Sequence, residues 1–180
     1  MADRRANSVV FGFDFQVNAA IVLFLENISE IESVRLEGNY EDVELGLSDG
    51  RYVFAQAKAV TNASSDFSHV RENLKKSLKT LAEANDKSKQ RAEKLILITN
   101  SPNPFNDDAS RNCFWGLSRR DYDTLPESAK SLIKQYIEEL RLNIDLSVFR
   151  IQVVPFETDV YSERYKAVKR EMPERGTKAL

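Results

Sequence analysis

Apolar residues recur at helical spacing in three parts of the chain. Near the start they stand at intervals of one, three or four, at Phe13, Val17, Ala20, Ile21, Phe24 and Ile28. This spacing predicts an amphipathic helix that buries these residues. Residues 67–81 repeat the pattern and predict a second helix. A capping box over 124–127 introduces a third helix with apolar positions between 132 and 140.

Apolar and polar residues alternate with period two between the first two helical patterns. Turn residues divide this part of the chain into three short predicted strands, over 33–37, 42–47 and 51–58. The continuous apolar run 95–99 predicts a strand buried on both faces, and 149–154 predicts a last strand. Because helices must cover the faces of such a sheet, the order predicts an α/β fold with a mixed central β-sheet flanked by helices.

The length of the chain limits the number of domains. With 180 residues the chain is long enough for one well-cored domain and short for two. We therefore expect a single domain over 1–180, with its core over about 10–157 and a basic helical tail over 158–180.

Composition narrows the choice of function. Hydrophobic residues make up 42% and charged residues 30%, a globular balance, and the net charge of −2 excludes overall basicity as a reason to expect nucleic-acid binding. One cysteine and one histidine exclude an intrachain disulfide and the usual zinc ligand sets. The longest apolar run, 17–25, is about half the length that spans a bilayer. We expect a cytoplasmic protein with no membrane partner.

Charge is unevenly distributed along the chain. Residues 26–50 hold eight acids and one base, whereas 71–94 hold eight bases and four acids. An acidic hairpin beside a basic helix suits a metal-dependent enzyme that acts on a polyanion, although ordinary solvated surfaces show the same segregation. If the helix follows a DNA backbone, its candidate phosphate contacts are Arg71, Lys75, Lys76 and Lys79.

Strand alternation decides which polar side chains meet. Asp42 and Glu44 point to one face of their strand, and Gln56 and Lys58 share a face of the next strand. A carboxylate, an amide and an ammonium group converge if these faces coincide, a set that suits phosphodiester hydrolysis. Mg²⁺ prefers oxygen ligands, so we predict Asp42 as its anchor, with Gln56 Oε1 and the carbonyl oxygen of Ala57 as neutral ligands. Lys58 would position the attacking water and offset charge in the transition state.

At these residues the sequence resembles the PD-(D/E)xK, or restriction-endonuclease-like, nucleases. It is most similar to the N-terminal DNA-cutting domains of bacterial antiphage effectors governed by cyclic oligonucleotides or by SMC-like ATPases. A Gly-aromatic-x-aromatic-Gln element opens the first helix of that subgroup and is matched by 12–16, which ends at Gln16. The subgroup also has an acidic residue before its metal-binding aspartate, and these two positions are matched by Glu37 and Asp42. The Gln-x-Lys motif is matched by 56–58.

The resemblance implies a low-specificity endonuclease for double-stranded DNA that uses Mg²⁺, with Mn²⁺ as a substitute. It implies catalytic roles for Asp42, Gln56 and Lys58, joined by Glu37 and Gln16. Because Gln56 replaces the usual glutamate, Glu37 or Glu44 would restore the missing negative charge. Cutting both strands needs two active sites, so we expect a homo-oligomer or a larger defence complex with a sensor domain or protein.

Two other interpretations remain open from the sequence. The chain could be a catalytically inactive nuclease-fold module that binds nucleic acid or a partner protein. It could also be a structural assembly domain whose basic helix forms an interface. A divalent-cation effect that depends on Asp42 separates a nuclease from both of them.

Overall fold

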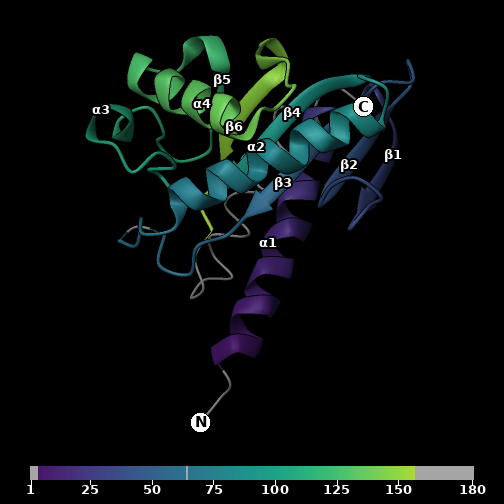
Figure 1. The fold of residues 1–180 in the computed structure, drawn as a ribbon. Helices are drawn as coiled ribbons and strands as arrows, with labels where there is room; N and C mark the ends of the chain where they lie inside the picture. The colour runs from purple at the N-terminus through teal and green to yellow at the C-terminus, as the bar shows by residue number, and fades with distance from the viewer. Residues whose placement is uncertain (1–3, 64, 157–180) are drawn as a thin grey trace.

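Figure 1 shows the computed structural model, in which residues 4–63 and 65–156 are described. The predicted tail over 158–180 lies outside these residues. The helices are α1 (Arg4–Glu26), α2 (Val70–Lys87), α3 (Asp108–Arg111) and α4 (Glu127–Leu140), with 3₁₀ turns at Tyr122–Thr124 and Leu146–Val148. The strands are β1 (Ile31–Leu36), β2 (Val43–Leu47), β3 (Tyr52–Lys58), β4 (Ala92–Thr99), β5 (Ser118–Asp121) and β6 (Phe149–Val153).

The six strands form one mixed sheet in the order β1-β2-β3-β4-β6-β5. The first three strands form an antiparallel meander, β3, β4 and β6 run parallel, and β5 pairs antiparallel with β6 at the far edge. The predicted α/β class, a mixed sheet flanked by helices, is confirmed. Strand β5 was not predicted, because its sequence Ser-Arg-Arg-Asp carries no apolar alternation.

The two faces of the sheet have separate hydrophobic cores. Phe15, Ala19 and Val22 of α1 pack on one face, against a cluster that includes Ala55 and Ile98. On the opposite face, leucines of α2 and Ile133 of α4 pack against Phe54, Leu95 and Leu97. Figure 1 shows α2 crossing the sheet obliquely, with α4 beside it.

The buried face predicted for α1 is wrong. Phe13 is 52% exposed, and Ile21 and Phe24 are also exposed, whereas Phe15, Ala19, Val22 and Leu23 are fully buried. Ala20 is the one predicted position that the structure buries, and Val17 is half-buried. The helix is apolar on two sides, and the sheet packs against the side that carries the small Ala19. Periodicity alone cannot choose between two apolar sides.

The segment Val9–Glu26 of α1, with a mean hydropathy of 1.6, is long and apolar enough to cross a membrane by length and composition alone. A buried helix of a water-soluble core passes the same test, and one side of α1 is packed on the sheet. The cytoplasmic location that the sequence suggests therefore stays a prediction.

Candidate functional site

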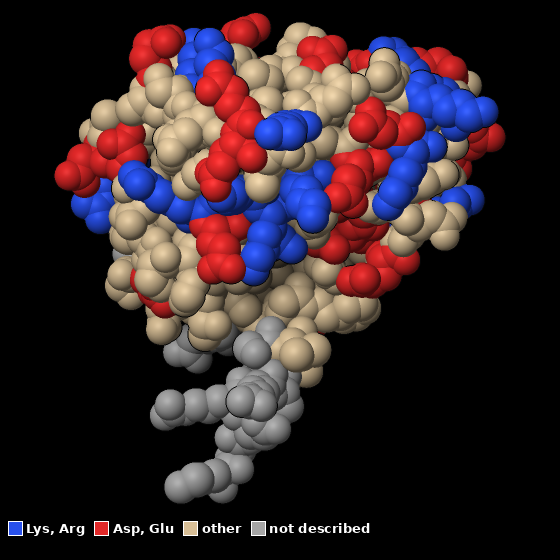
Figure 2. Space-filling view, in the orientation of Figure 1, with Lys and Arg blue, Asp and Glu red and all other residues tan. Residues whose placement is uncertain are grey.

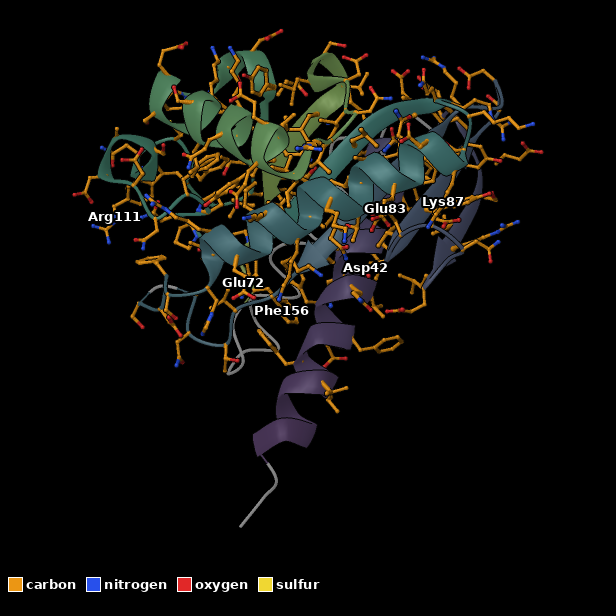
Figure 3. All side chains as sticks on the ribbon, viewed as in Figure 1. Asp42, Glu72, Glu83, Lys87, Arg111 and Phe156 are labelled. Carbon is orange, nitrogen blue, oxygen red and sulfur yellow. The ribbon has the colours of Figure 1, made fainter. Side chains whose placement is uncertain are left out.

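The candidate site lies where the β2–β3 hairpin meets α2. Val43 pairs with Ala55 across the two antiparallel strands, which places Asp42 directly before β2 and level with the end of β3. Phe54 belongs to the core under α2, so Gln56 and Lys58 share its face by strand alternation. Figure 3 shows Asp42 close to α2, between the parts of the helix marked by Glu72 and Lys87. The predicted convergence of these strands is therefore present.

Asp42 is bound to the end of β3 by two hydrogen bonds. Its Oδ2 accepts one bond from the backbone N–H of Ala57 at 2.9 Å and one from Nε2 of Gln56. Among the described residues, no hydrogen bond reaches its other carboxylate oxygen, Oδ1. Asp42 is only partly buried. The carboxylate is thus fixed in orientation while one oxygen stays available to a ligand.

Gln56 connects Asp42 to α2. The side chain is 5% exposed, and its Oε1 accepts a hydrogen bond of 2.7 Å from the hydroxyl of Thr80. The amide nitrogen, not the oxygen, therefore faces Asp42. This corrects the predicted ligand role of Gln56 Oε1, because that oxygen is already used by Thr80. As it lies, Gln56 orients Asp42.

Glu41 is the site residue that the sequence did not reveal. It is 6% exposed, and its Oε1 is buried with no hydrogen-bond partner among the described residues. Burial raises the pKa of Glu41 to about 7, and the neighbouring charge of Asp42 adds to the rise, while Thr80 and Lys58 oppose it. A buried carboxylate with an unpartnered oxygen is costly, so Glu41 holds its proton more tightly than an exposed glutamate does.

Lys58 lies at the rim of this cluster. Its backbone carbonyl accepts a hydrogen bond of 2.7 Å from the Thr99 hydroxyl of β4, which fixes the end of β3. Its side chain is half-buried. Within residues 4–63 and 65–156 the ammonium group has no salt bridge, although its charge lowers the pKa of Glu41. The ammonium group is therefore available to an anionic ligand.

The structure gives Glu44 a different role from the predicted one. Its Oε1 accepts backbone hydrogen bonds from Tyr40 and, at 3.1 Å, from Glu41. Its carboxylate also fills the space beside Gly38, where an added Cβ would lie 2.3 Å from Glu44 Cδ. Glu44 therefore stabilises the loop that presents Glu41 and Asp42, and we remove it from the metal-ligand set.

Among the described residues, no side-chain hydrogen bond or ion pair links Glu37 or Gln16 to the cluster, so their roles stay predictions. The backbone N–H of Glu37 donates to the carbonyl of Asp42 at 2.9 Å, but the Glu37 side chain is exposed. Gln16 belongs to α1, which packs on the face of the sheet opposite to the one that Gln56 shares with α2. The strand pattern correctly brought Asp42 and Gln56 together, while the role of Lys58 stays a prediction. The pattern gave no information about residues outside strands.

The four predicted phosphate contacts on α2 are engaged within the protein. Arg71 donates to the carbonyls of Phe105 and Asn106, and Lys75 pairs with Glu139 and lies over the ring of Tyr136. Lys76 pairs with Glu72, and Lys79 approaches Glu83. Figure 2 shows blue and red side chains interspersed on this face of the molecule. Basic side chains are therefore interspersed with acidic ones on this helix surface, and the four phosphate contacts stay a prediction.

The residues fit a divalent cation of the magnesium type only weakly. No group of three His, Cys, Asp or Glu side chains in the described residues is arranged to hold a metal. Mg²⁺ retains several waters, however, and needs only one or two protein carboxylates beside its substrate's phosphate. Asp42 and the orphaned oxygen of Glu41 can supply those two carboxylates.

Comparisons of this chain with protein-family models, with curated proteins and with solved structures found no match in any of the three. The nuclease resemblance therefore remains a prediction, based on the motif residues and their geometry.

Proposed function

We propose that this protein is a metal-dependent endonuclease that hydrolyses phosphodiester bonds of double-stranded DNA with low sequence specificity. In this proposal it is a restriction-endonuclease-like effector of bacterial antiphage defence, activated when it self-associates or joins a larger assembly. Mg²⁺ is the proposed cofactor, and Mn²⁺ can replace it.

The observation that carries the proposal is the set of contacts at the end of β3. Asp42 is held by the N–H of Ala57 and by Gln56, while the charge of the Lys58 ammonium group acts on the neighbouring carboxyl group of Glu41. Such a set places an anionic cation-binding group and a positively charged group side by side. Phosphodiester hydrolysis needs both, because one binds the metal and the other offsets charge that develops on the phosphate.

Each residue of the cluster has a proposed task. Asp42 and Glu41 would hold the cation, with the carbonyl of Ala57 as a neutral ligand. The bound metal would act as a Lewis acid and lower the pKa of a coordinated water. Gln56 holds the Asp42 carboxylate in place through its amide nitrogen. Lys58 would contact the scissile phosphate and stabilise its added negative charge.

The second candidate is an inactive module of the same fold that binds nucleic acid or a partner protein. One observation favours it: the amide nitrogen of Gln56 already compensates part of the Asp42 charge. An Asp42 that is satisfied in this way needs no metal. Response to divalent cations therefore discriminates between the two candidates.

The deciding experiment incubates the purified full chain with supercoiled plasmid in Mg²⁺, in Mn²⁺ and in EDTA. We expect nicked and then linear DNA only with a divalent cation. Lys58→Ala should lower the rate by about 10²- to 10³-fold, the loss typical of one electrostatic group at a transition state. Glu32→Gln, which removes an exposed carboxylate on β1, is the matched control and should cleave at the wild-type rate.

Thermal unfolding gives a second reading that does not require turnover. A cation that binds the folded state should raise the melting temperature of the wild type and of Glu32→Gln. Asp42→Asn should abolish the increase. If the wild type shows neither cleavage nor a cation-dependent shift, the nuclease proposal fails and the inactive-module candidate replaces it.

A further inference from the structure

The side of α1 that faces away from the sheet is apolar and uncovered. Val9 is 72% exposed, Val10 60%, Phe13 52%, and Ile21 and Phe24 are exposed by more than a third. We call these five residues the outer stripe. Ile28, at 48% exposure, extends it beyond the end of the helix. The outer stripe lies opposite Phe15, Ala19 and Val22, which pack on the sheet. Both sides of α1 are thus built for burial, and one has no partner among the described residues.

The first half of α1 also projects beyond the body of the molecule, as Figure 1 shows. Helices of this kind draw most of their stability from packing, and a helix that is apolar on all sides is normally buried. The most exposed residues of the outer stripe, Val9, Val10 and Phe13, lie on this projecting half. The projecting half therefore needs an external surface to pack against.

The neighbouring edge strand continues the apolar surface. Val34 and Leu36 of β1 pair with Leu45 and Val43, which lie in the core under α1. They therefore face the same side of the sheet as α1, yet they are 41% and 36% exposed. These exposed apolar residues of β1 add to the apolar surface on the α1 side of the sheet.

The charge around the outer stripe disfavours a membrane as its occupant. Interfacial helices rely on Lys and Arg at their flanks to meet anionic headgroups. Basic residues stand only at the start of α1, as Arg4 and Arg5, whereas the residues that follow the helix are acidic, with Glu30 and Glu32 exposed. A transbilayer position would require Phe15 and Ala19 to leave the hydrophobic core. A protein surface without charge fits the outer stripe better.

The spacing of α1 favours pairing with another helix of the same kind. Val10, Phe13, the half-buried Val17 and Phe24 stand at intervals of three, four and seven along α1. This is the a/d repeat of two packed helices. Ala20, which would fill the remaining position of this repeat, is already buried in the core under α1. Because none of these positions is charged, the same surface can face itself across a twofold axis without repulsion.

We propose that the outer stripe is the contact surface for a second copy of this chain, with α1 packed against α1. The inference stands on exposure and helix spacing and does not depend on the nuclease proposal. If both hold, one dimer carries two candidate sites, as cleavage of both DNA strands requires.

Sedimentation velocity of the full chain between about 1 and 100 μM tests the interface. We expect a concentration-dependent dimer for the wild type. Phe13→Glu should raise the dissociation constant by at least about tenfold, because a large aromatic anchor is replaced by a charge that meets its own copy. Trp115→Glu is the control, since Trp115 is 80% exposed and lies outside the outer stripe; it should dimerise like the wild type. Should Phe13→Glu misfold, Val10→Ser replaces it at a site that is 60% exposed.

A wild type that stays monomeric over this range overturns the inference, as does a folded Phe13→Glu that dimerises normally. Sedimentation with vesicles of phosphatidylcholine and phosphatidylglycerol is the second arm. Vesicle binding that Phe13→Glu abolishes, in a protein that is monomeric in solution, would assign the outer stripe to a lipid surface instead. A monomer that cleaves DNA contradicts this inference and the proposed activation by self-association, but not the proposed nuclease activity. A dimer without cleavage contradicts only the proposed function.

Discussion

Glu41 shows how a single residue can be hidden from sequence analysis. Strand alternation placed Asp42, Gln56 and Lys58 on one face, but Glu41 stands in the loop before β2, where alternation does not apply. Its environment includes Thr80 of α2, which lies far from it in sequence and meets it only in the folded protein. A pair of adjacent acids in a predicted hairpin was therefore the only signal available.

The raised pKa of Glu41 makes stability depend on pH. Because the pKa rises from 4.5 to about 7 on folding, the folded state holds its proton more tightly than the unfolded state. This contribution is fully present below about pH 4.5 and is lost as pH rises through about 7. In EDTA, the free energy of unfolding of the wild type should fall by up to about 1.4 kcal/mol per pH unit between pH 5 and 7 because of Glu41. Glu41→Gln should not show this fall.

Urea unfolding at several pH values measures this effect. The wild type should lose stability relative to Glu41→Gln as pH rises through that interval. The exposed control Glu32→Gln should follow the wild type throughout. Parallel curves for the wild type and Glu41→Gln would show that the Glu41 carboxylate is not strained by burial.

At the scale of elements, the loop between β1 and β2 requires a residue without a side chain at Gly38. The Glu44 carboxylate occupies the space beside Gly38 and binds the loop backbone. A methyl group at Gly38 would displace this carboxylate and release the backbone N–H of Glu41. We expect Gly38→Ala to destabilise the fold by about 1–3 kcal/mol, as overpacking does.

Chemical denaturation measures the change, and Gly12→Ala provides the contrast. A Cβ at Gly12 meets nothing within 4 Å, and the residue lies inside α1. Alanine there should stabilise the protein by about 0.5–1 kcal/mol, because alanine favours helices over glycine. Equal effects of the two substitutions would contradict the role of Gly38.

The elements themselves were largely predictable. Residues 95–99 formed a continuous apolar run and are the buried end of β4, and the alternation over 42–47 became β2. The prediction failed for the buried side of α1 and for β5. The first has two apolar sides, and the second is held by its pairing with β6 and not by its own sequence. In both cases the deciding contact is distant in sequence, so a local pattern cannot contain it.

At the scale of the whole molecule, ion pairs on the surface limit how DNA could be bound. Lys76 already pairs with Glu72 at 2.6 Å, whereas Lys58 has no salt bridge among the described residues. We expect Lys76→Gln to leave DNA affinity and its salt dependence nearly unchanged. Lys58→Gln should reduce the slope of log affinity against log salt by about 0.9, the value for one phosphate contact.

Fluorescence anisotropy with labelled duplex DNA in Ca²⁺, between about 50 and 200 mM salt, measures both slopes. Lys134→Gln on α4 serves as a control for loss of a distant positive charge. An equal fall in slope for Lys76→Gln and Lys58→Gln would restore α2 as a phosphate-binding surface. No fall for either variant would remove DNA from the proposal.

The hydrogen bond between Thr99 and the carbonyl of Lys58 has a consequence for synthesis on the ribosome. The hairpin and α2 emerge first and contain both partners of the Ala57–Asp42 and Thr80–Gln56 hydrogen bonds. The carbonyl of Lys58 gains its partner only after β4 has been made and has paired beside β3. A chain truncated before β4 would therefore carry the candidate residues without the strand that completes their support. If the protein cuts DNA as proposed, this order of folding would keep unfinished chains from damaging the host genome.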